Sequence, residues 1–139
     1  MYNRKRQQGF TLIELLVVLT ILAMLAALVV PRVFRSLEKA KVNTAKAQIA
    51  AFESAIGSYR LDVGSFPSTD MGLQALRTRP TGVDNWDGPY VPKEIPLDPW
   101  GHPYVYRCPS EHGDYEIISY GADGKEGGEG LDADIASWK

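Results

Sequence analysis

Acidic residues gather near the C-terminus, in a stretch rich in glycine. The acids are Asp123, Glu126, Glu129, Asp132 and Asp134, and the glycines are Gly121, Gly124, Gly127, Gly128 and Gly130. Glycine lets the backbone turn sharply and expose its carbonyls. Calcium takes about six to eight oxygen ligands from carboxylates, carbonyls and water, so this stretch suits a calcium loop. The alternative is a solvated acidic loop, because charged runs commonly only face solvent.

This acidic stretch does not match an EF-hand. Counted from Asp123, Lys125 stands at the third loop position, where an Asp or Asn is expected, and the glycines are misplaced. Any calcium site here must therefore have another geometry.

His102, Cys108 and His112 are the other residues whose types suit chemistry. They lack the close paired spacing of zinc ligands, which disfavours a zinc site. No local Ser-His-Asp or Cys-His signature is present, so surface histidines and a packed cysteine are the simpler interpretation. Cys108 is the single cysteine, which excludes an intrachain disulfide. We expect no enzymatic activity.

One carboxylate, Glu14, lies inside an apolar run from Phe10 to Val30. Thr11 and Thr20 are the only other polar side chains there. About twenty residues at about 1.5 Å each cross the hydrocarbon core of a bilayer. A carboxylate at such a place is costly, and marks either a functional residue or an acid that reaches the interface from the helix end.

Basic residues precede this run, as in a signal-type insertion segment with a cytoplasmic N-terminus: Arg4, Lys5 and Arg6. The run is too long for an ordinary secretory signal and lacks a nearby Ala-x-Ala. Its other flank is also basic, with Arg32, Arg35, Lys39 and Lys41. Charge alone therefore leaves the orientation open.

A long helix is expected to continue beyond the apolar run. Pro31 should bend it or melt it locally. Helical periodicity then resumes in one apolar stripe, formed by Ala45, Ile49, Phe52, Ile56, Tyr59 and Val63. Gly64 suits the C-terminal cap. Only the rest of the chain is available to cover this stripe.

The remaining chain predicts a short helix and a small sheet. Thr69 or Asp70 could cap a helix that runs to residue 77, and 78–92 is irregular. Strands are expected over 104–108 and 115–120 around a hairpin loop at 109–113, with a weak third strand at 90–95. Trp86, Trp100 and Trp138 should fill the core or subunit contacts. The fold class is α+β: a long N-terminal helix packed on a short helix and an antiparallel sheet.

Net charge is −2, and no basic surface suggests nucleic acid. At 139 residues, the chain has room for the apolar segment and one small domain.

The N-terminal residues carry a resemblance to a known family. Arg4-Lys5-Arg6, then Gly9, then Phe10-Thr11-Leu12-Ile13-Glu14 and an aliphatic run resemble the prepilin signature of type IV pilins and pseudopilins. Three further stretches are similar to the major (type G) pseudopilins of the bacterial type II secretion system: FPSTDMGLQAL at 66–76, DPWGHPY at 98–104 and SYGADGKEGGEG at 119–130.

The resemblance implies specific residue roles. A prepilin peptidase would cut after Gly9 and methylate the new N-terminal amine of Phe10. Glu14 would pair with the amine of a neighbouring subunit. Calcium would be bound by the carbonyls of Tyr120 and Lys125 and the side chains of Asp123, Asp132 and Asp134. Because Ala133 separates two acids here, Glu126 is an alternative ligand.

The resemblance also implies an organisation: a leader at 1–9, an apolar transmembrane and assembly helix at 10–30, an amphipathic continuation at 31–64, and a periplasmic domain at 65–139 with the calcium loop at 119–134. The chain would be an inner-membrane, single-pass protein that polymerises into a periplasmic pseudopilus driving folded proteins through an outer-membrane channel. Its partners would be copies of itself, minor pseudopilins, an inner-membrane assembly platform and the prepilin peptidase.

Two other functions stay open from the sequence. One is a type IV pilin or competence pseudopilin, although pilins usually carry a C-terminal disulfide that Cys108 alone cannot form. The other is a membrane-anchored periplasmic enzyme or binding domain.

Overall fold

A computed structural model describes residues 8–139. One long helix is followed by short elements joined by irregular chain. In order, they are helix α1 (Leu12–Val63), the 3-10 helix η1 (Leu73–Leu76), strands β1 (Val105–Arg107) and β2 (Glu116–Ser119), the 3-10 helix η2 (Gly130–Asp132) and strand β3 (Ile135–Ala136). The chain divides into two compact units, Met1–Leu37 and Glu38–Lys139.

Of the two expectations for Pro31, a bend or local melting, local melting is wrong, because helix α1 continues through this residue. Proline removes one backbone hydrogen bond, and the helical turns on both sides remain intact. The C-terminal end is as predicted: Gly64, with φ of +88°, donates its N–H to the carbonyl of Arg60 at 2.8 Å.

In the first unit, the apolar side chains of α1 are exposed. Leu15, Leu22 and Leu28 are between 54% and 60% exposed, and their neighbours are similar. Among residues 8–139, α1 is the one helix long and apolar enough to span a membrane, and its most apolar 18 residues are entirely unburied within the chain. This segment therefore needs an apolar environment from outside the chain.

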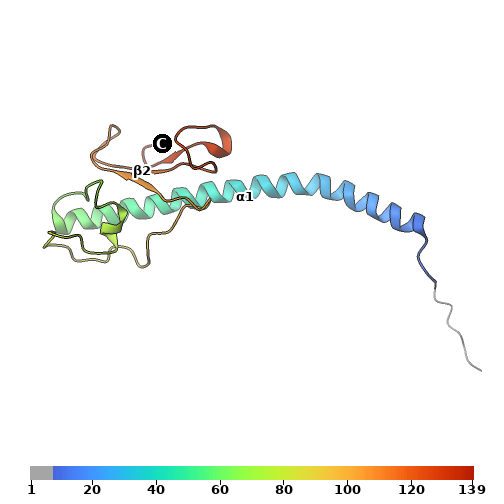
Figure 1. The fold of residues 1–139 in the computed structure, drawn as a ribbon, viewed down its shortest axis with the longest axis horizontal. Coiled ribbons are helices and arrows are strands. Elements are labelled where there is room, and N and C mark those ends of the chain that lie inside the picture. The colour runs from blue at the N-terminus through green and yellow to red at the C-terminus, as the bar shows by residue number, and fades with distance from the viewer. Residues whose placement is uncertain (1–7) are drawn as a thin grey trace, which may run out of the picture. The chain divides into compact units, whose positions relative to one another are not determined.

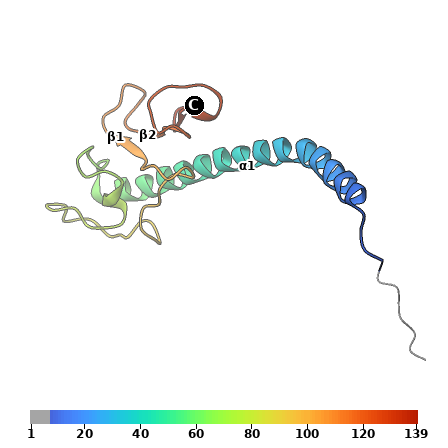
Figure 2. The same cartoon turned by 45° about the vertical axis from the view of Figure 1, so that its right-hand side comes forward.

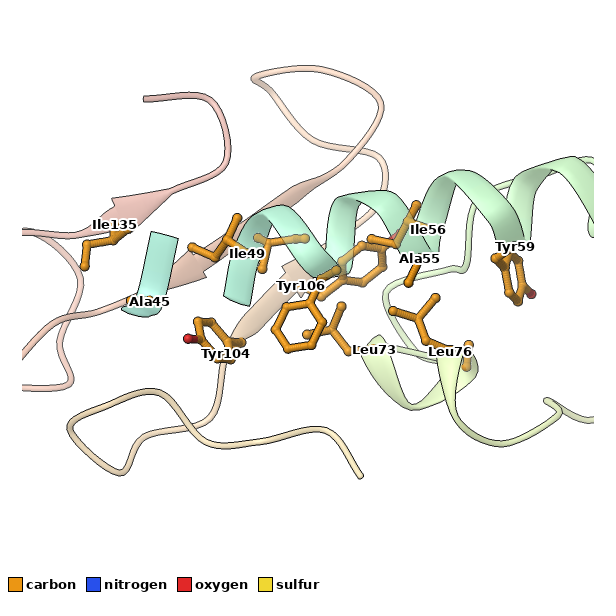
Figure 3. Packing of buried hydrophobic residues seen from close by; sticks show 13 residues of the cluster. Ala45, Ile49, Ala55, Ile56, Tyr59, Leu73, Leu76, Tyr104, Tyr106 and Ile135 are labelled. Carbon is orange, nitrogen blue, oxygen red and sulfur yellow. The ribbon is translucent and has the colours of Figure 1, made fainter. Parts of the chain in front are cut away.

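In the second unit, the stripe on α1 forms one side of the core. Ala45, Ile49, Phe52, Ile56 and Tyr59 are at most 4% exposed. Figure 3 shows side chains of the stripe directed at those of η1, β3 and the region of β1: Leu73, Leu76, Tyr104, Tyr106 and Ile135. The predicted stripe is confirmed, and the rest of the chain covers it.

The sheet is antiparallel, in the order β1-β2-β3. Tyr106 pairs with Ile117, and Ile118 pairs with Ala136. The sheet lies beside the half of α1 that belongs to the second unit (Figures 1 and 2). All four residues of β2 are buried, because β2 is the central strand. The α+β class with a small antiparallel sheet is confirmed.

Three details differ from the sequence-based expectations. Residues 90–95 are not a strand, and the third strand is instead β3, which is too short to show periodicity. Thr69 does not cap η1, because its hydroxyl donates to the carbonyl of Cys108 at 3.0 Å. Trp138 does not fill the core: it is 37% exposed and stacks on His112, with ring centroids 3.9 Å apart.

A buried carboxylate, Glu116, joins the hairpin to the sheet. Its Oε1 accepts a hydrogen bond from Arg107 at 3.0 Å, and its Oε2 accepts one from Ser110 at 2.7 Å and lies 2.8 Å from His112 Nδ1. Burial alone would raise the pKa of Glu116, but the bonds to Ser110, His112 and Arg107 outweigh it and lower the pKa. The ionised form is therefore favoured in the folded state.

We expect Glu116→Gln to destabilise the chain at pH 7 by about 1.5–3 kcal/mol, because a hydrogen-bonded charge is lost. A lowered folded pKa gives stability that is present above the unfolded pKa of about 4.3 and is lost as pH falls through the folded value. The variant should therefore lose less stability than wild type between pH 6 and pH 3. Denaturant unfolding of the full chain in detergent micelles measures both effects.

Glu111→Gln, at an exposed position in the hairpin loop before β2, removes a charge and none of these bonds, and serves as the control. Equal acid sensitivity of Glu116→Gln and wild type would show that this network adds no pH dependence.

Candidate functional site

The predicted cleavage position lies just before α1. An added Cβ at Gly9 would meet no atom within 4 Å, and its φ lies outside the left-handed region. Phe10 is 93% exposed. The fold itself therefore does not require glycine at position 9. The basic residues Arg4-Lys5-Arg6 lie outside the described residues.

Glu14 and Thr11 form a capping box at the start of α1. Thr11 donates its backbone N–H at 2.9 Å and its hydroxyl at 3.1 Å to Glu14 Oε2. The backbone N–H of Glu14 donates to the Thr11 hydroxyl at 3.2 Å. These bonds satisfy donors that a helix start leaves free. The sequence carries the signal for this box, Thr-x-x-Glu at residues 11–14, although the box was not among the sequence-based expectations.

The acidic stretch folds back on itself, so that its beginning, at 121–122, lies close to its end, at 131–133. Ala122 donates its N–H to the carbonyl of Leu131 at 3.1 Å. A Cβ at Gly121 would come within 3.0 Å of the Ala133 carbonyl, and one at Gly128 within 2.6 Å of the Asp132 carbonyl. Both glycines also have positive φ, so a larger residue would be strained at either position. Glycine at positions 121 and 128 therefore allows the backbone there to approach residues 131–133 closely.

Two of the predicted calcium ligands make hydrogen bonds within the loop. Asp134 Oδ2 accepts the N–H of Gly127 at 2.9 Å, and Asp123 Oδ1 accepts the N–H of Lys125 at 3.1 Å. Asp134 Oδ1 is buried and has no hydrogen-bond partner. A buried carboxylate oxygen without a partner is costly, and a bound cation would supply the missing partner.

The acids are not assembled into one cluster. Within the described range 8–139, no three His, Cys, Asp or Glu side chains lie close enough to hold a metal ion together. Asp123, Glu126 and Asp132 are exposed, whereas Asp134 is half-buried. A cation here would therefore rely on few carboxylates, with carbonyls such as those of Tyr120 and Lys125 and water completing the shell.

The histidines have other partners. His102 Nδ1 lies 3.1 Å from the carbonyl of Gly121, and His112 contacts Glu116. Two buried polar residues beside His102, Asp98 and Ser119, were not among the predicted site residues. Asp98 and Ser119 are 4% and 0% exposed, and the Ser119 hydroxyl donates to Asp98 at 2.6 Å. Both lie in the stretches that resemble pseudopilins, but nothing in residue type alone indicates that they meet.

Two family models match the chain. Residues 4–30 match the prokaryotic N-terminal methylation motif, which places the capping box and the apolar run within that motif. Residues 32–138 match the type II secretion system protein G family. The chain belongs to this family.

Relatives of known name agree along nearly the whole chain. The type II secretion system core protein G of Pseudomonas aeruginosa is 49% identical over 98% of both chains. That of Vibrio cholerae is 45% identical over 99% of this chain and 96% of its own. The crystal structure of the major pseudopilin from the type 2 secretion system of enterohaemorrhagic Escherichia coli matches with a TM-score of 0.65 at 35% identity, over 76% of this chain and 92% of its own. The α+β protein is thus a pseudopilin of the protein G family.

Proposed function

We propose that this chain is the structural subunit of a type II secretion pseudopilus, a periplasmic helical filament that drives folded proteins through the outer-membrane channel. The observation that carries the proposal is the exposed apolar half of α1 in a chain of the protein G family. The N-terminal methylation motif and the apolar helix anchor the chain in the inner membrane.

The apolar half of α1 also suggests how subunits assemble. This segment can leave the lipid only if it is buried in another apolar environment. The same segment in neighbouring copies of the chain provides such an environment. A head-to-tail contact between identical chains that does not close generates a helical filament. Minor pseudopilins, an inner-membrane assembly platform and the prepilin peptidase are the further partners. The function is structural, and no catalytic step is assigned to this chain.

Processing after Gly9 prepares the subunit for assembly. Because Gly9 makes no contact that needs glycine, its role lies in recognition by another protein, the prepilin peptidase. Cleavage there gives Phe10 a free amine, which the peptidase methylates.

We expect Gly9→Val to leave uncut precursor in the membrane, because a side chain next to the cut bond blocks close approach of the peptidase. Folding should be unchanged, since a Cβ at this position meets open space. Mass spectrometry of the N-terminal peptide distinguishes precursor from chains that begin at methylated Phe10. Gln8→Val, one residue earlier, is the control and should be processed. Normal processing of Gly9→Val would contradict this assignment.

Glu14 is proposed to pair with the amine of Phe10 in a neighbouring subunit. The capping box uses Oε2, and Oε1 takes no part in it. A buried amine and a buried carboxylate are tolerable together and expensive apart. The pairing would therefore favour assembled subunits over isolated ones.

Glu14→Val and Glu14→Gln separate capping from charge. Valine removes the charge and the carboxylate that accepts from Thr11, although the Thr11 hydroxyl can still accept the backbone N–H of residue 14. Glutamine can keep the capping box without the charge. Both variants should insert into the membrane, and both should lose filaments and secretion at native expression, measured by electron microscopy and by secreted protein. Normal assembly of Glu14→Gln beside failure of Glu14→Val would assign Glu14 to capping alone.

The C-terminal loop is proposed to bind calcium. Its potential ligands are all oxygen atoms, which suits a hard cation. The unpartnered Asp134 Oδ1 and the close approach at Gly121 and Gly128 fit a bound ion. Asp123, Asp132 and Asp134 would supply side chains, and Tyr120 and Lys125 carbonyls, with Glu126 as the alternative. The ion would offset the repulsion among these acids.

Chelation should lower the melting temperature of the full chain in detergent micelles and expose 124–130 to protease. A ligand specific for the native state adds about 2.7 kcal/mol at a hundredfold excess over Kd. Magnesium should substitute poorly, because it requires a tighter octahedron and retains its waters. Asp123→Ala and Asp134→Ala should mimic chelation, whereas Glu129→Ala removes an exposed acid outside the proposed ligand set and is the control. If chelator does not change the melting temperature, the calcium proposal is wrong and the stretch is only a solvated acidic loop.

A further inference from the structure

The turn at 98–102 lies outside the proposed ligand set and packs against the loop that contains it. The turn is closed by its own hydrogen bonds. Asp98 donates its N–H to the carbonyl of His102 at 2.8 Å, and Asp98 Oδ1 accepts the N–H groups of Trp100 at 3.1 Å and His102 at 2.8 Å. One oxygen of a buried carboxylate thus fixes the shape of the turn.

The other oxygen of Asp98 faces the start of the loop. Asp98 Oδ2 accepts the hydroxyl of Ser119 at 2.6 Å, and that hydroxyl oxygen accepts the N–H of Gly121 at 3.4 Å. His102 Nδ1 lies 3.1 Å from the carbonyl of Gly121. Because a carbonyl only accepts, Nδ1 carries the proton and donates. Both backbone polar groups of Gly121 are therefore held through this turn.

The ring of His102 also lies against the next part of the loop. A Cβ at Gly124 would come within 2.9 Å of His102 Nε2. The contacts of His102 thus lie on both sides of the proposed ligand Asp123, and Gly121 directly follows the proposed ligand Tyr120.

The turn is itself tied to α1. Trp100 Nε1 donates to Glu38 Oε2 at 3.1 Å, and Glu38 Oε1 accepts from Lys41 at 3.0 Å. The turn therefore links α1 to the loop within the second unit.

We propose that His102 is a positioning residue for the cation. Through its hydrogen bond to Gly121 it fixes the conformation of the backbone at 120–124, and the turn at 98–102 holds His102 in place. This inference rests on the proposed calcium site and extends it to residues that do not touch the ion. Ligands held in place before binding lose less conformational entropy when the ion arrives. Outer partners of metal ligands typically change metal affinity about 10–100-fold when mutated.

The test uses the full chain in detergent micelles, with calcium as the ligand. His102→Phe keeps a flat ring against Gly124 and removes the donor, whereas His102→Asn offers an amide N–H near the position of Nδ1. Calorimetric titration should show a calcium Kd raised about tenfold or more in His102→Phe, and closer to wild type in His102→Asn. The melting temperatures of wild type, His102→Phe and His102→Asn should differ when calcium is present. In excess chelator the differences between them should be much smaller.

His112→Phe is the matched control, because His112 contacts Glu116 and Trp138 and not the loop. It should lower the melting temperature with or without calcium and leave the calcium Kd unchanged. If His102→Phe does not fold, Ser119→Ala, which removes the acceptor for the N–H of Gly121, must raise the Kd in the same way.

An unchanged Kd in His102→Phe, with a lower melting temperature in chelator, would overturn the positioning role and leave ordinary structural support. A wild-type chain that binds no calcium would overturn the calcium proposal, and this inference with it. The wild-type titration thus distinguishes the two failures.

Discussion

The need to bury the apolar surface of α1 governs this protein. The helix presents two kinds of apolar surface along one continuous backbone. From Ala45 to Tyr59, a single stripe is covered by the chain's own domain. Before residue 38, apolar side chains lie around the helix and no described part of the chain covers them. Because burial of apolar surface is the dominant favourable term in folding and association, one half completes a fold and the other requires lipid or another subunit.

The small domain has little regular structure with which to hold its C-terminal loop. Three short strands and two 3-10 turns leave most of the chain irregular. Buried polar side chains provide connections that the short sheet does not. Glu116 ties the hairpin to the sheet, and Asp98 ties a turn to β2 and to the acidic loop. Glu116 and Asp98 are each hydrogen-bonded on both carboxylate oxygens, so their desolvation is offset.

Sequence reasoning predicted the parts that follow from periodicity and motif. The stripe on α1 repeats every three or four residues, and the hairpin strands are rich in β-branched and aromatic residues. It could not place β3, whose two residues pair only because β2 leaves an edge open. Nor could it predict that Asp98 and His102 meet Ser119 and Gly121, because that contact depends on how two loops pack. The pattern Thr-x-x-Glu was sufficient to predict the capping box. The prediction for Glu14 instead considered only the cost of its charge inside an apolar run.

The capping box also has a consequence for how subunits are exchanged. The first turn of α1 is held by Thr11 and Glu14 of the same chain, and neither residue is removed by cleavage after Gly9. The helix start can thus keep one conformation in the precursor, in the mature subunit in the bilayer and in the filament. A subunit that enters or leaves the fibre can then keep the hydrogen bonds of its first helical turn, and this turn needs no capping partner from a neighbouring chain.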